Sequence, residues 1–183
     1  MNKSGYTTRI ALTVALGGFL MGFDASVISG VNKFIQIEFN LTDLQLGFSV
    51  SSLTIVAALA MMISGPLSDK LGRKLVLKFC ALIFTVSAVG SALASGFTSF
   101  LLFRMLGGLG VGASLIVAPM YIAEIAPASK RGRLVSFNQL NIVLGITIAF
   151  FTNYYILSLA DSTSSWVSTY GLVAHNWRWM LGI

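Results

Sequence analysis

Two ionisable residues lie well inside long apolar stretches of this sequence, Asp24 in the first stretch and Arg104 in the fourth. A charged side chain in hydrocarbon is costly, so each of them needs a partner or a function. If the first helix ends near Gly30, Asp24 and Arg104 lie at similar depth on neighbouring spans, and we expect them to face each other. Two interpretations stay open. The pair could be a structural ion pair between two helices, or a proton or substrate site whose carboxylate changes protonation when the cation withdraws.

A further acid, Glu124, lies twenty residues after Arg104, which is about 30 Å along a helix. This distance places Glu124 at the other membrane face, where it can meet Arg73, Arg131 or Arg133. A solvated surface pair there would contribute little. A network that forms only when the ends of helix bundles come together would instead act as a gate, and both interpretations remain open.

Uncharged polar side chains occupy the fifth apolar stretch. Gln139, Ile146 and Asn153 recur every seven residues and are expected to share one helix face, while Asn138 and Asn141 lie on other faces. Amides of this kind suit a neutral polyol, whereas a phosphate or carboxylate substrate would call for more than one buried base. The sequence has no Ser/His/Asp, Cys/His or metal-ligand grouping, so we expect no enzyme activity, no metal and no cofactor.

The elements that must position these residues are membrane helices. Hydrophobic residues make up 56% of the 183 residues and charged residues only 10%, which is far from the composition of a soluble domain. A span needs about 20 apolar residues. Five complete spans are expected at 10–31, 46–67, 75–94, 97–122 and 134–159, and a sixth apolar stretch begins at Trp177.

Small residues indicate where these helices approach closely. Gly108 and Gly112 have GxxxG spacing in the fourth span, and Gly18 and Gly22 repeat it in the first. We interpret this pattern as packing that keeps the first helix beside the fourth. The dinucleotide fingerprint that begins at Gly108 is rejected, because it lies inside an apolar span with no preceding strand.

The net charge of +6 is explained by membrane topology rather than by a nucleic-acid partner. Lys33 lies in the predicted loop from Lys33 to Asp43, on the side of the membrane opposite to the N-terminus. By the positive-inside rule the N-terminus is cytoplasmic, and the loops from Lys33 to Asp43 and from Ser158 to Asn176 are external. Nine basic residues are expected on the cytoplasmic side: Lys3, Arg9, Lys70, Arg73, Lys74, Lys78, Lys130, Arg131 and Arg133.

The short connection between the second and third spans carries the most specific motif. It reads Gly-Pro-Leu-Ser-Asp-Lys-Leu-Gly-Arg-Lys over residues 65–74. Gly65, Pro66 and Gly72 are expected to make the reversal, and Asp69 can cap a helix start or pair with a neighbouring base. So short a connection predicts a helical hairpin.

Together these motifs resemble the sugar porter family of the major facilitator superfamily over nearly the whole chain. The resemblance rests on residues 17–24 with 27–30, 65–74, 104–112, 119–132, 139–146 and 177–180. It implies a twelve-helix carrier of two six-helix bundles that binds sugar at the midplane. The chain would be an all-α membrane protein, the N-terminal bundle truncated at the start of helix six, with the C-terminal bundle absent and required for transport.

The resemblance also implies roles for single residues. An acid at Asp24, paired with Arg104, marks proton-coupled symporters, and Gln139 contacts sugar hydroxyls. Met21 stands where many members have a sugar-stacking aromatic residue, and Ile146 stands where xylose symporters have a glutamine and glucose facilitators an aliphatic residue. The expected cytoplasmic gate consists of Asp69, Arg73, Glu124 and Arg131.

We therefore expect a multi-pass cell-membrane protein whose full-length form moves a monosaccharide with a proton by alternating access. Its expected partners are sugar, proton and the lipid bilayer. Two alternatives remain: a facilitative sugar uniporter, and a non-transporting sugar sensor or assembly module.

Overall fold

The computed structural model describes residues 3–160 and 176–182, and these form helices throughout apart from short connections. In chain order, the helices are α1 Lys3–Glu38, α2 Asp43–Leu71, α3 Arg73–Ala92, α4 Phe97–Ile125, α5 Arg131–Ala160 and α7 Asn176–Gly182. The expected all-α fold class is confirmed. The predicted external loop from Ser158 to Asn176 lies mostly outside the described residues.

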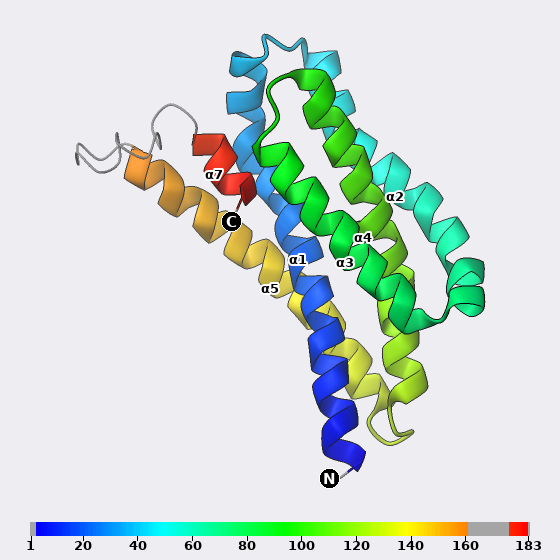
Figure 1. Ribbon diagram of the computed structural model, residues 1–183. Helices are drawn as coiled ribbons and strands as arrows, with labels where there is room; N and C mark the ends of the chain where they lie inside the picture. The colour runs from blue at the N-terminus through cyan, green and yellow to red at the C-terminus, as the bar shows by residue number, and fades with distance from the viewer. Residues whose placement is uncertain (1–2, 161–175, 183) are drawn as a thin grey trace.

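Five of these helices are long and apolar enough to cross a membrane, as predicted. Figure 1 shows that they alternate in direction, with the N-terminus and the α2–α3 and α4–α5 connections at one end and the α1–α2 and α3–α4 connections at the other. Many large apolar side chains on their outer faces are exposed, as lipid-facing positions are.

The helices extend beyond the predicted apolar runs. α1 continues to Glu38 and includes Lys33, so the predicted loop from Lys33 to Asp43 is much shorter than expected. A capping box sets the start of α2: the backbone N–H of Gln45 donates to the Thr42 hydroxyl (3.3 Å), and the Gln45 side chain accepts from the Thr42 N–H (3.0 Å). Apolar composition marks only the part of a helix that meets hydrocarbon, whereas capping chemistry marks its ends.

The predicted reversal at Gly65 and Pro66 is wrong, because both residues lie within α2. The chain turns at Gly72 alone, which has φ +88°, a conformation that favours glycine. Proline is tolerated inside a membrane helix where neighbouring groups satisfy the freed backbone. The missing N–H of Pro66 leaves the carbonyl of Met62, four residues earlier, without its usual helical donor. Asp69 pairs with Arg73, the second of the two roles expected for it.

The glycine pattern brings helices together, but in different pairs from those expected. A Cβ atom at Gly22 would overlap the backbone carbonyl of Ile142 in α5, and one at Gly18 would lie 2.9 Å from the carbonyl of Asn138. Gly145 of α5 makes the reciprocal approach to Phe19. The Gly18/Gly22 pair therefore packs α1 against α5.

The glycines of α4 likewise face α2 rather than α1. Cβ atoms at Gly108 and Gly112 would overlap the backbone carbonyls of Leu53 and Ala57. GxxxG spacing predicts that two backbones approach closely, but it carries no information about which helix the partner is. The prediction that these motifs join the first helix to the fourth is wrong for this reason.

The short helix α7 begins where the sixth span was expected and closes one end of the bundle. Trp177 is buried, and its ring meets the rings of Phe39 and Phe100 edge-on at centroid distances of 5.9 and 6.1 Å. The Trp177 indole N–H donates to Glu38 at the end of α1, and Arg178 lies 3.6 Å from the same carboxylate. α7 is thereby tied to the ends of α1 and α4.

The α1–α5 contact predicts a sharp difference between two glycines of one helix. Gly22→Ala should destabilise the protein by about 1–3 kcal/mol, because the new methyl group meets backbone that cannot move alone. Gly17→Ala is the matched control: no atom lies within 4 Å of its Cβ position, and stability should hold or rise slightly. Thermal unfolding in detergent measures both, and equal midpoints would contradict the close approach.

Candidate functional site

The expected ion pair between α1 and α4 is present. Arg104 Nη1 lies 2.7 Å from Asp24 Oδ1, and the side chains are 3% and 17% exposed respectively. Arg104 Nε is also buried and has no hydrogen-bond partner. The cation is thus enclosed, and the carboxylate is the more exposed member of the pair.

The pair forms although the helix end used to predict it was wrong. Arg178 contacts both Glu38 at the end of α1 and Ala94 in the connection that precedes α4. Asp24 lies about 21 Å before the end of α1, and Arg104 lies about 10 Å after the start of α4 at Phe97. The long side chain of Arg104 covers part of this difference in depth.

The candidate sugar-contacting residues lie on α1 and α5. Gln139 is exposed, and Met21 and Ile146 are half-buried. None of the three lines either of the two hollows described for this chain. The structure therefore gives their positions and exposure, and their role stays a prediction.

Asn153 differs from Gln139 in its burial. It is buried against α1, where its amide donates to the carbonyl of Val27 (3.2 Å), whereas Gln139 is exposed. Two seven-residue repeats drift by only about 40° on a straight helix, so the two residues lie on nearly the same face of α5, and the difference comes from the packing of α1 at the level of Asn153. Asn138 is likewise buried against Gly18, and its Oδ1 has no partner.

At the opposite end, three of the four expected gate residues join. Arg73 Nε lies 3.0 Å from Glu124 Oε1, and Arg73 also pairs with Asp69. The arginine side chain is 16% exposed, whereas Glu124 and Asp69 are 50% and 62% exposed. Arg131, at the start of α5, is exposed and makes no ion pair with Glu124 in the described part of the chain.

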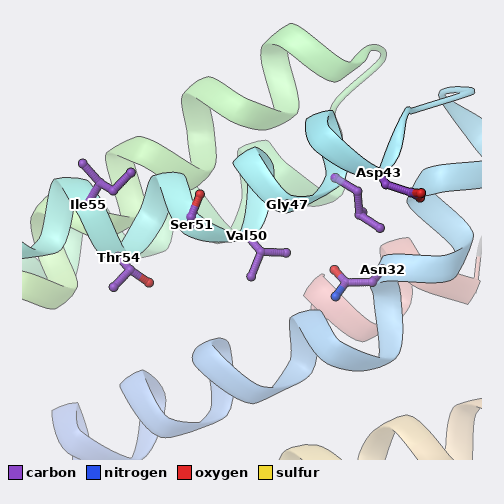
Figure 2. A pocket seen from close by; sticks show the side chains of 8 residues that line it. Asn32, Asp43, Gly47, Val50, Ser51, Thr54 and Ile55 are labelled. Atoms are coloured by element: carbon purple, nitrogen blue, oxygen red, sulfur yellow. The ribbon is translucent and has the colours of Figure 1, made fainter.

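Sequence reasoning missed Asn32, whose buried Oδ1 has no partner. It lines a hollow of about 560 Å³ between α1 and α2, and Figure 2 shows Asn32 pointing towards α2, from which Val50 and Thr54 point back. The predicted first span ended at residue 31, so Asn32 became recognisable as an amide within a helix only once α1 was seen to continue to Glu38. Among residues 3–160 and 176–182, no three His, Cys, Asp or Glu side chains gather as a metal site.

Comparison with known proteins gives consistent matches over the whole chain. The family model for "Sugar (and other) transporter" matches residues 10–183. A glucose transport protein of Synechocystis is 43% identical over 96% of this chain and 37% of its own length. The D-xylose-proton symporter of Escherichia coli is 38% identical over 97% of this chain and 40% of its own length.

A solved structure agrees with these sequence matches. The major facilitator superfamily proton:xylose symporter XylE, bound to 6-bromo-6-deoxy-D-glucose, superposes with a TM-score of 0.84 at 35% identity, over 98% of this chain and 42% of that chain. This chain thus spans less than half the length of the relatives it matches.

The buried ion pair predicts a double-mutant cycle. Asp24→Ala should destabilise the protein by about 3–5 kcal/mol, because it leaves the enclosed guanidinium unpaired. Arg104→Met should be less costly, since Asp24 keeps some access to water. The Asp24→Ala/Arg104→Met double variant should be clearly more stable than the sum of the two losses predicts. Unfolding in detergent measures all three, and strictly additive losses would show that the pair is not coupled.

Proposed function

The chain belongs to the sugar transporter family, within the sugar porters of the major facilitator superfamily, and from this premise we propose that the full-length protein carries a monosaccharide together with a proton. The observation that supports coupling is the Asp24–Arg104 ion pair inside the bundle. Proteins of this family are transporters and not enzymes.

In the proposed cycle Asp24 carries the proton. In the closed ion pair the Asp24 carboxylate and the Arg104 guanidinium lie 2.7 Å apart and neutralise each other. When a conformational change draws Arg104 away, Asp24 is left as an isolated acid in a poorly hydrated environment, where the neutral form is favoured. Proton binding then stabilises the separated state, so protonation and conformation become linked.

The proposed substrate is a neutral sugar. Asp24 and Arg104 neutralise each other at 2.7 Å, so among the residues whose burial the structure describes the only buried base is already paired and is not free to bind a phosphate or carboxylate. Gln139 is exposed on α5 and can exchange hydrogen bonds with hydroxyl groups. We propose Gln139, with Met21 and Ile146, as the contribution of this chain to the sugar site.

Ile146 favours a second candidate, facilitative uniport, because glucose facilitators are expected to carry an aliphatic residue at that position. Asp24 argues for symport instead. The measurement that separates the candidates is accumulation against a gradient, since a uniporter equilibrates sugar and cannot concentrate it.

We also propose that this chain supplies the N-terminal bundle and that a C-terminal six-helix bundle completes the carrier. Figure 1 shows the N-terminus and the α2–α3 and α4–α5 connections at one end of the bundle, and nine of the twelve basic residues lie in or next to these segments in the sequence, which favours a cytoplasmic location for that end. The contacts of Arg73 with Asp69 and Glu124 would form a cytoplasmic gate. Arg131, which begins α5 directly after the α4–α5 connection, would be its fourth member.

The coupling proposal is tested with the full-length carrier in vesicles under an inwardly directed proton gradient, with the outside more acidic than the inside. Asp24→Asn should abolish proton-driven sugar accumulation and leave sugar exchange largely intact, because the Asn oxygen still accepts a hydrogen bond from Arg104. Asp43→Asn is the matched control, since Asp43 is an exposed acid that accepts from Gln36 at 2.8 Å, and it should accumulate sugar normally.

Two outcomes would overturn this proposal. If Asp24→Asn still concentrates sugar in response to the gradient, the proton travels through another residue. If wild-type transport is inhibited as strongly by sugar phosphates as by free sugars, the substrate is not a neutral sugar.

The orientation proposal predicts the labelling of two engineered cysteines in intact cells. Asn40→Cys, in the connection between α1 and α2, should react with an impermeant thiol reagent added outside, and Lys70→Cys should react only after the cells are opened. The native Cys80 is buried and gives little background. External labelling at position 70 and protection at position 40 would reverse the topology.

A further inference from the structure

A second hollow, of about 450 Å³, lies at the start of α3 beside the end of α4. Its polar lining comes from Arg73, Lys74 and Lys78 of α3 and from Tyr121 of α4. Lys74 and Lys78 are four residues apart and therefore lie on one face of α3. Three basic side chains and a phenol thus converge on one opening.

The charges around this hollow are not balanced. Arg73 is occupied by Asp69 and Glu124. In the part of the chain that the structure describes, Lys74 and Lys78 form no ion pair, and both are exposed. Since the two acids are already engaged, the hollow carries excess positive charge.

The helix itself adds to this excess. The first turn of α3 contains Arg73 and Lys74 and no acid, although the N-terminus of a helix carries partial positive charge and favours anions. The arrangement is unfavourable unless a negative group lies close by. Glu124 and Asp69 serve Arg73, and nothing described serves Lys74 or Lys78.

The position of the hollow points to a lipid as the source of that negative group. α3 spans the membrane from Arg73 to Ala92, so the hollow lies at the depth of lipid headgroups. Lys78 lies five residues after Arg73, about 7.5 Å deeper along α3. Its long apolar stem allows its ammonium group to reach back to the level of the lipid headgroups. Leu71 and Leu75 line the same hollow and are 49% and 43% exposed, which offers apolar surface to an acyl chain.

We propose that this hollow binds the phosphate group of an anionic membrane lipid. The ammonium groups of Lys74 and Lys78 donate hydrogen bonds to the phosphate oxygens, and the Tyr121 hydroxyl donates a third. The lipid is recognised by its charge and phosphate together, so phosphatidylglycerol fits and the zwitterionic phosphatidylcholine does not. This inference depends on membrane insertion of α3 and is independent of what the carrier transports.

The test titrates the full-length protein in detergent with phosphatidylglycerol or with phosphatidylcholine of the same acyl chains, and native mass spectrometry counts the bound lipid. Phosphatidylglycerol should bind more tightly. Lys78→Gln should weaken its binding about five- to tenfold, Lys78→Arg should retain it, and Tyr121→Phe should weaken it a few-fold. Lys70→Gln is the matched control, because it removes one charge from the same connection without lining the hollow, and it should change binding less than twofold.

Three results would overturn the proposal. Equal binding of the two lipids would show that no anionic headgroup is selected. Equal losses for Lys78→Gln and Lys70→Gln would show diffuse attraction to a basic surface rather than a site. Complete displacement of the lipid by millimolar inorganic phosphate would assign the hollow to a free anion.

Discussion

The structure depends on one constraint: a charge in the hydrocarbon region needs a partner within the protein, because hydrocarbon solvates it poorly. Asp24 and Arg104 satisfy this constraint for each other across α1 and α4. α1 obtains its close backbone packing elsewhere, from α5 through Gly18, Gly22 and Gly145. The contact between α1 and α4 at this depth is therefore held by an electrostatic interaction, which a proton can weaken, rather than by tight glycine packing.

Ion pairs in the centre of the bundle and at its ends differ in the free energy needed to separate them. The central pair includes a guanidinium that is 3% exposed, whereas the acids that contact Arg73 are at least half exposed. Exposed pairs contribute little and can exchange with water, so contacts at the helix ends can open and close at low cost. The enclosed central pair can separate only if its charges are compensated. This contrast is what the proposed cycle uses.

Particular residues show how far sequence reasoning reaches. The five spans, the start of the last helix and the Asp24–Arg104 contact were predicted, because transfer free energy alone demands them. Pro66 was misassigned to a turn, since whether a proline ends a helix depends on the surroundings of that helix, which the local sequence does not give. Gln139 and Asn153 lie about 40° apart around α5, yet only Asn153 is buried, because α1 packs against α5 at its level.

The sequence by itself determined the membrane fold, the number of spans and the residues that need partners, since these follow from composition and from the energy of burying a charge. It also carried the motifs that place the chain in its family. Only the tertiary structure decided which helix each glycine face meets, which carboxylates join Arg73, and that Lys74, Lys78 and Tyr121 surround one hollow. The physical reason is that spacing along a helix defines a face, but the identity of its partner depends on how all the helices pack together.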